Sequence, residues 1–400
     1  MDSLLLNPLF LEFTGALIRW AHVITAIAWI GSSFYFMHLD ASLQPIQEIP
    51  AGKGGATWEV HGGGFYEVRK YLEAPAHLPK ELIWHKWQSY ATWITGFFLL
   101  VWVYYAQAEL FLVDPAIMSL SLLQASSLGI AALALGWLVY DGLCRSPLAG
   151  NESALAVAGF VFIVAMAWGF QQVFSGRGAL IHVGAMMATI MTANVFLIII
   201  PGQKKIIAAL LAGEKPDPAL GKRAKIRSVH NNYLTLPVVF LMLSNHYPLL
   251  YGTSLGWLIV ALVLIAGALI RHFYNIRHAG LGDPWWTWIV AALCLIGVFW
   301  IAISASRAGL ETVAATLPKA PDAVVTIIQG RCSMCHGAEP LWPGIALAPK
   351  GVHLDTPQSI QRQKSAIRLH SVLSRAMPPN NITDLTLEER RILAQWTGTR

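Results

Sequence analysis

Residues 332–336 of this 400-residue chain read Cys-Ser-Met-Cys-His, which is a C-x-x-C-H motif. Thiols at this spacing, on Cys332 and Cys335, can form thioethers with both vinyl groups of a haem, and the adjacent His336 can reach the iron. The second axial ligand is often methionine, and Met377 lies 41 residues beyond His336. A zinc site, the alternative, needs two further ligands at ordered spacing, and no second cysteine pair exists. The motif therefore predicts one covalent haem c, with His336 and Met377 on its iron.

Residues 321–400 resemble small monohaem cytochromes c over their full length. This segment holds 15 charged side chains in 80 positions, whereas residues 1–320 hold 35 in 320. Its last part, Thr386–Trp396, predicts an amphipathic helix opened by a capping run. We expect a small water-soluble domain at 321–400, joined to the rest of the chain by a linker at 307–320.

The remaining composition is that of a membrane protein. Charged residues make up 12% of the chain, against about 25% in a soluble domain, and the mean hydropathy is +0.52. Such a chain has too few charges to cover a water-facing surface, which excludes an ordinary soluble enzyme, a disordered protein and a fibrous repeat. The net charge of +6 does not indicate nucleic acid, because the basic residues lie in loops between apolar runs. The expected partner is the lipid bilayer.

A helix needs about 20 apolar residues to cross the ~30 Å hydrocarbon layer. Eight segments qualify, namely 12–37, 87–108, 117–140, 153–173, 178–200, 231–248, 254–271 and 285–306. We therefore expect an all-α fold: a polytopic bundle of about eight transmembrane helices in residues 1–306, followed by the small monohaem domain.

The basic residues predict the orientation of this bundle. Fifteen Lys and Arg residues lie in the loops after the first, third, fifth and seventh spans, and few lie on the other side. Basic loops stay in the cytoplasm. The sequence thus predicts a multi-pass protein of a bacterial inner membrane, with residues 321–400 in the periplasm.

The long loop at 38–86 lies on the basic side. Its middle, Thr57–Tyr71, has two alternating stretches around three consecutive glycines, a pattern that predicts a β-hairpin. Loops of this length tend to be functional or disordered, and the aromatic content of this one favours order.

Three histidines fall within the spans on the side opposite the basic loops: His22, His182 and His246. Ionisable side chains at membrane depth are costly, so they are usually functional or face a polar interior. Two of them, from different helices, can ligate a haem b, and the alternative is buried, hydrogen-bonded histidines. The stretch His22–Gly31 resembles the first helix of the haem-binding membrane porphyrinogen oxidases. This resemblance favours His22 as a haem b ligand, with His182 or His246 as its partner.

Arg, Asn, His and aromatic residues gather at the predicted cytoplasmic ends, at 61–66, 84–88, 230–233 and 271–278. Such a set suits a flat, anionic heterocycle, because aromatics stack on its face, amides read its edge and Arg balances its charge. The alternative is an interfacial aromatic belt with basic anchors.

Taken together, five stretches and the terminal haem motif resemble the bacterial membrane-bound urate oxidases (urate hydroxylases) that are fused to a cytochrome c. These stretches are His22–Gly31, Trp58–Tyr71, His85–Gln88, His230–Pro237 and Ser244–Pro248. The resemblance covers essentially the whole chain. It implies oxidation of urate to 5-hydroxyisourate, with electrons passing through haem to the cytochrome c domain and not directly to O₂. A soluble periplasmic cytochrome or a terminal oxidase would then accept the electrons.

Under this hypothesis a base is needed to deprotonate urate or activate water. The candidate bases are His61, Glu59 and His230. The candidate substrate-binding residues are Arg69, Phe65, Tyr66, Asn231, Asn232 and Arg271. A haem-containing quinol or porphyrinogen oxidoreductase is an alternative enzyme class, although the long polar loop would then lack a purpose. A non-enzymatic electron carrier or a copper-handling protein is a third class, and copper would favour Met or Cys clusters along the pathway.

Overall fold

The computed structural model describes residues 8–49, 53–72, 79, 81–114, 117–307, 321–345, 348–349 and 352–398. The chain is mostly helical. The elements up to residue 307 are α2 (Pro8–Ser42), β1 (Gly54–His61), β2 (Gly64–Tyr71), α3 (Trp87–Leu100), η1 (Val101–Tyr105), α4 (Ala108–Phe111), α5 (Leu122–Arg145), η2 (Pro147–Gly150), α6 (Glu152–Gln171), α7 (Gly176–Ala193), η3 (Asn194–Ile199), α8 (Ile200–Leu211), α9 (Pro218–Ser244), α10 (Pro248–Tyr251), α11 (Gly256–His278) and α12 (Trp286–Arg307).

Six helical segments within the described residues are long and apolar enough to cross a membrane. They are Phe13–Ser42, Leu122–Arg145, Glu152–Gln171, Gly176–Leu211, Gly256–His278 and Trp286–Ser304. Each of them matches a predicted span. The other two predicted spans are also helical: α3 is continued by the π-helical turn η1, and α9 carries a polar middle. Both pack inside the bundle, against α2, α7 and α11, but their crossing of the membrane stays a prediction.

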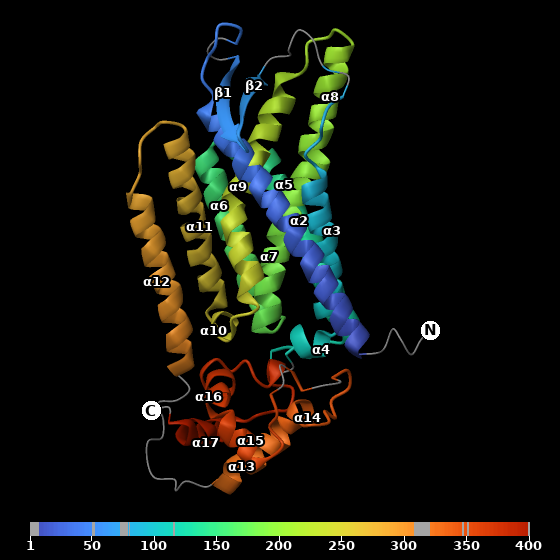
Figure 1. The fold of residues 1–400 in the computed structure, drawn as a ribbon, viewed down its shortest axis with the longest axis vertical. Helices are drawn as coiled ribbons and strands as arrows, with labels where there is room; N and C mark the ends of the chain where they lie inside the picture. The colour runs from blue at the N-terminus through green and yellow to red at the C-terminus, as the bar shows by residue number, and fades with distance from the viewer. Residues whose placement is uncertain are drawn as a thin grey trace.

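Two helical segments are longer than a bilayer requires. α2 has 35 residues, and α7, η3 and α8 run without a break over the 36 residues Gly176–Leu211. At about 1.5 Å per residue, each spans more than 50 Å. Residues 201–230, expected as a loop, instead form α8 and the start of α9, because Asp217 caps a new helix that opens with Pro218. These extensions lie at the same end of the bundle as β1 and β2 (Figure 1).

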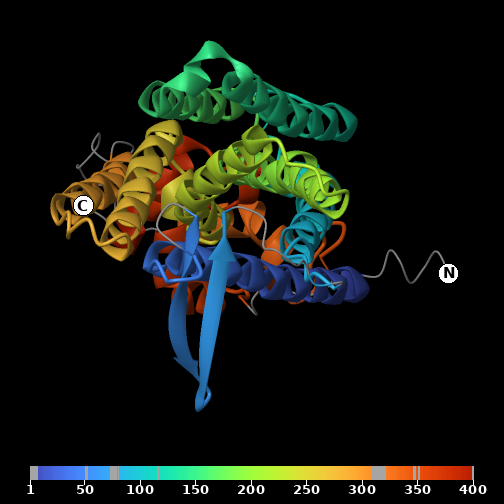
Figure 2. The ribbon, with the colours of Figure 1, turned by 90° about the horizontal axis from the view of Figure 1, so that it is seen from above.

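The predicted hairpin is confirmed. β1 and β2 pair antiparallel, with Trp58 opposite Glu67 and His61 opposite Gly64. Gly62 and Gly63, at φ 59° and 80°, form the two-residue connection, for which positive φ at both positions is the preferred geometry. Figure 2 shows the hairpin projecting sideways from the bundle.

α7 forms the centre of the bundle and packs against α3, α5, α6 and α9. Its side chains Met186, Met187 and Ile190 are almost completely buried. α5 and α6 cover one face, and α2 covers the opposite face (Figure 2).

Residues 321–398 form a separate helical unit at the end of the bundle opposite the hairpin (Figure 1). Its elements are α13 (Pro321–Arg331), α14 (Ser333–His336), α15 (Pro357–Arg362), α16 (Lys364–Ile367), η5 (Arg368–Leu373), η6 (Pro379–Asn381) and α17 (Leu387–Thr397). It has its own apolar core, which includes Ile328, Leu354, Ile360 and Leu393. The predicted last helix is present, and its cap, Thr386, accepts a hydrogen bond from the Glu389 amide. The predicted linker, 307–320, lies almost entirely outside the described residues.

Candidate functional site

The C-x-x-C-H motif lies at the end of α13 and in the single turn of α14. Cys332 is buried, and burial raises the pKa of its thiol to about 12. The His336 Nδ1 atom lies 2.9 Å from the Val352 carbonyl oxygen, which leaves Nε2 for a metal. Burial also lowers the pKa of His336, and the neutral imidazole is the form that binds metals.

Met377 belongs to the same unit, in the loop before η6. Its amide donates to the His370 carbonyl at 2.9 Å, and its carbonyl accepts from Arg390 at 3.0 Å. Among the described residues, no group of three or more His, Cys, Asp or Glu side chains is placed to hold a metal ion. A haem held by two thioethers, one His and one Met needs no such group. The donor set therefore fits a haem c, which stays a prediction.

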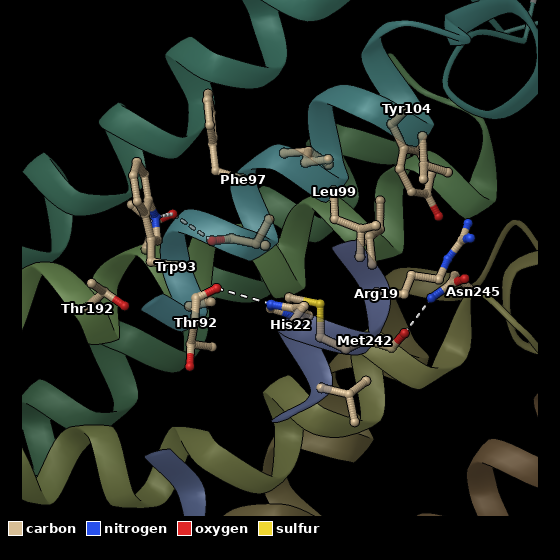
Figure 3. Close-up of a pocket in the computed structure, with 18 of the residues that line it drawn as sticks. Arg19, His22, Thr92, Trp93, Phe97, Leu99, Tyr104, Thr192, Met242 and Asn245 are labelled. Carbon is tan, nitrogen blue, oxygen red and sulfur yellow. Dashed lines mark hydrogen bonds between the residues drawn. The ribbon is translucent and has the colours of Figure 1, made fainter. Parts of the chain in front are cut away.

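A first cavity, the histidine cavity, lies between α2, α3, α7 and α9 (Figure 3). Its lining residues Arg19 and His22 belong to the first half of α2, which begins at the end of the bundle next to the C-terminal unit (Figure 1). Its volume is about 220 Å³, and its lining is mostly apolar, with Arg19, His22 and His246 among the exceptions. The His22 Nδ1 atom lies 3.1 Å from both the Thr92 carbonyl oxygen and the Thr95 hydroxyl. This fixes the ring and leaves Nε2 open, as in metal-binding histidines.

The His22 ring lies directly against the backbone of α3. A Cβ atom added to Gly96 would lie 2.8 Å from His22 Cε1, so only glycine fits there. The donors suit a haem b iron, whereas the volume is below the ~300–1,000 Å³ of common small-molecule sites. The haem b therefore stays a prediction.

His182 lies elsewhere. It is fully buried, and its ring nitrogens lie 2.8 Å from the Gly178 carbonyl oxygen and 3.2 Å from the Tyr105 hydroxyl. Phe174 packs against its ring, with 4.7 Å between centroids. The structure thus brings His22 and His246 to one cavity and gives His182 the environment of a buried, hydrogen-bonded histidine.

A second cavity, the hairpin-end cavity, has a volume of about 360 Å³. α2, the segment before α3, η3, α8 and α9 form its walls. The lining combines aromatic, hydroxyl and amide groups, namely Trp29, Phe36, Trp84, Ser32, Ser33, Ser228, Gln203 and Asn231. Its two ionisable lining residues are Asp40 and His85. Asp40 forms an ion pair with Lys70 of β2, whereas the His85 Nδ1 atom has only the Gln88 amide at 3.4 Å as a described hydrogen-bond partner.

A buried polar network supports the wall of this cavity. Asn231 accepts from Asn194 at 2.9 Å and donates to the Met191 carbonyl at 2.9 Å. Arg227 donates to Asn194 at 3.2 Å and to Asp141 at 2.5 Å. Asn194 opens the π-helical turn η3, and such turns are frequent at functional sites.

A second arginine is buried near the same end, between α9 and α11. Arg271 donates to Asn232 at 3.3 Å and to Asn275 at 3.4 Å, and its guanidinium lies 4.0 Å from the centroid of the Phe34 ring. Among the residues that the structure describes, the buried Asn232 Nδ2 atom has no hydrogen-bond partner. Within the described residues, no carboxylate forms an ion pair with Arg271.

The predicted site residues are only partly brought together. Asn231 lines the hairpin-end cavity, and Asn232 contacts Arg271. His230 is held by the Tyr140 hydroxyl at 2.8 Å instead and does not line the cavity.

The remaining predicted residues lie on the hairpin. His61, Phe65 and Tyr66 are exposed near its tip. Glu59 accepts from the Tyr35 hydroxyl at 2.8 Å, and Arg69 pairs with Glu67 at 3.0 Å. None of these five lines either cavity.

Sequence reasoning missed Asn194, Asp141 and Arg227 as a network, and it did not select His85 as a base. Asn194 carried a usable signal, because it is an amide side chain inside the mostly apolar run 178–200. Its link to Arg227 could not be read from the sequence, because the two residues lie on different helices.

The fold places the protein in a general class: a bundle of membrane-type helices that contains the histidine cavity and the hairpin-end cavity and carries a helical unit at one end. The sequence matches the family described as Urate oxidase N-terminal over residues 8–302, and the chain belongs to this family. Comparison with curated proteins gave no match, and neither did comparison with solved structures. Membership of this family supports a urate-related oxidoreductase.

Proposed function

We propose that this protein oxidises urate to 5-hydroxyisourate and delivers the electrons to a haem c in its C-terminal unit, not directly to O₂. The reaction adds one water to urate and releases two electrons and two protons. The observation that carries the proposal is the family match over residues 8–302, which covers the bundle and both cavities. The C-x-x-C-H motif lies outside that match and supplies the electron acceptor.

The hairpin-end cavity is the proposed urate site. Its volume of about 360 Å³ lies within the range of common small-molecule sites. Trp29, Phe36 and Trp84 offer flat apolar surfaces for a purine, and the amides of Asn231 and Gln203 offer donors and acceptors for its edge. Arg271 does not line this cavity, but it contacts Phe34 and Asn232, the chain neighbours of the lining residues Ser33 and Asn231. From there its positive charge would favour an anionic substrate.

His85 is the proposed base for this site. Of the two ionisable residues that line the cavity, Asp40 is already engaged by Lys70, while His85 has one weak described hydrogen bond. An imidazole is suited to accept a proton near neutral pH. This assignment replaces His61, Glu59 and His230, which do not line the cavity.

The C-terminal unit would hold the haem c through Cys332 and Cys335, with His336 and Met377 on the iron. When bound, that group supplies a one-electron acceptor. A haem b held by His22 and His246 in the histidine cavity is a further proposal. Both would lie on the side of the bundle away from the hairpin.

The orientation is also part of the proposal. The hairpin, α8 and the start of α9 carry basic residues at one end of the bundle, and the C-terminal unit lies at the other (Figure 1). Because basic segments stay in the cytoplasm, the hairpin end would be cytoplasmic and the C-terminal unit periplasmic. A soluble periplasmic cytochrome or a terminal oxidase would then collect the electrons.

The proposal is tested with purified full-length protein in detergent under argon, with urate and an added soluble cytochrome c as acceptor. We expect urate to be consumed, with two acceptor molecules reduced for each urate. A variant with Cys332→Ser and Cys335→Ser should bind urate but reduce no acceptor. Urate consumption that requires O₂ and yields peroxide, undiminished in this variant, would contradict the proposal.

A further inference from the structure

Among the described residues, the C-terminal unit contacts the membrane bundle in two places: η6 packs against α4, and η5 packs against α12. The first of these contacts is made by a short loop. The Asn380 side-chain amide donates to the Val113 carbonyl at 2.8 Å, and η6 packs against α4. Val113 is buried. The contact therefore joins the unit to the backbone of the bundle at a defined atom.

The backbone of this loop is unusual. Within the described residues, every non-glycine residue with positive φ lies between 375 and 384: Arg375 at 50°, Asn380 at 48°, Asn381 at 53° and Asp384 at 54°. Asn and Asp tolerate this conformation, but Arg does not prefer it. Backbone of this kind persists only where the surroundings hold it, and it clusters at functional sites.

A buried arginine of α17 holds the loop in this shape. Arg390 donates to the carbonyl oxygens of Ser371 and Met377 and, at 2.9 Å, to the Asn381 side-chain oxygen. All its described hydrogen bonds go to neutral oxygens, one in η5 and two in the loop, so its role is to hold the loop against η5. The same loop carries Met377, three residues before Asn380.

On the bundle side, the contact leads to the histidine cavity. Ser175, the cap of α7, binds the carbonyl oxygens of Phe111 and Leu112 at 2.9 and 2.8 Å. The Phe111 ring lies 6.3 Å from that of Tyr104, and Tyr104 lines the histidine cavity. A series of contacts thus runs from this cavity through α4 to the loop.

We propose that the loop 375–384 is a docking surface of the C-terminal unit on its own membrane domain, in addition to the contact of η5 with α12, with Asn380 as the positioning residue. Met377 lies three residues before Asn380, so docking through this loop would place Met377 at the edge of the unit next to the bundle. Electrons would therefore enter the C-terminal unit at this edge, a consequence that rests on the proposed function.

The test compares three variants of the full-length protein by hydrogen exchange. Asn380→Gly keeps the left-handed backbone but removes the donor, and Asn380→Asp keeps the shape but places an acceptor against the Val113 carbonyl. Asp384→Asn, a change in the same loop, is the control. We expect the Leu112 and Val113 amides, which bond to the Ala108 carbonyl, to exchange about three- to tenfold faster in Asn380→Gly, as for the loss of one hydrogen bond. The increase should be larger in Asn380→Asp and absent in the control.

A second readout separates docking from the reaction. Ascorbate should reduce the haem of all variants equally, whereas urate should reduce it more slowly in both Asn380 variants than in the control. Unchanged exchange at Leu112 and Val113 in both Asn380 variants would overturn the docking proposal. If urate fails to reduce the haem of the unmodified protein, the proposed function fails, and the exchange result still decides the docking.

Discussion

The ion pair between Asp141 and Arg227 predicts which of the two residues is more costly to replace. The Arg227 side chain is 3% exposed, whereas that of Asp141 is 14% exposed and also binds Arg145 at 2.6 Å. Removing Asp141 therefore leaves a buried guanidinium without a carboxylate. Removing Arg227 leaves a carboxylate that still has a cation beside it.

The expected magnitudes follow from this asymmetry. Asp141→Asn should cost about 3–5 kcal/mol, as for a buried charge that loses its partner. Arg227→Met should cost about 2 kcal/mol, because two hydrogen bonds are lost but no buried charge is left uncompensated. The double variant should cost less than the sum of the two, because the charge stranded by the first change is removed by the second.

The assay measures the free energy of unfolding of the two single variants and the double variant. Each protein is held in mixed micelles and unfolded by titration with a denaturing detergent. Urate affinity is measured alongside, since Arg227 supports Asn194 and, through it, the cavity residue Asn231. Asp141→Asn should be the least stable variant. A larger loss in Arg227→Met than in Asp141→Asn, or simple additivity, would refute this reasoning.

Three further predictions concern the other sites. His85→Gln should lower the turnover number by about 10²–10⁴ with little change in urate binding, as for the loss of a general base; steady-state kinetics that change only KM would count against it. Gly96→Ala should displace the His22 ring, because the added Cβ would lie 2.8 Å from it, and should lower non-covalent haem content as His22→Ala does, measured by acid extraction. Burial raises the pKa of Glu389, but hydrogen bonds from Thr386 and Arg331 outweigh this and hold that pKa below its usual 4.5. Stability of the C-terminal unit, followed by circular dichroism, should therefore be lost as the pH falls below about 4.5, and Glu389→Gln should remove this dependence.

Much of the fold could be predicted because its signals are local. Six apolar runs matched membrane-type helices, the glycine run matched a two-residue hairpin connection, and the cap at Thr386 began the last helix. Residues 201–230 were expected as a loop because they lie between two apolar spans and carry several charges. Charged residues are disfavoured in the hydrocarbon layer but not in a helix. A helix that continues beyond the bilayer can therefore be polar.

The site could be predicted only in part because it depends on how helices are rotated. The neighbours Asn231 and Asn232 face different surroundings: one binds Asn194, and the other binds Arg271. The hairpin residues His61 and Phe65 have suitable chemistry, but the hairpin projects from the bundle and leaves them away from both cavities. Neither outcome follows from composition or spacing alone.

The central claim is that urate is the electron donor for the haem of the C-terminal unit. The most direct measurement mixes oxidised full-length protein with urate, without oxygen and without any added acceptor, and follows the visible spectrum of the haem. We expect growth of the reduced c-type band and formation of 5-hydroxyisourate, with one urate consumed for every two electrons stored. A haem that stays oxidised with urate, yet is reduced by dithionite in the same sample, would contradict it.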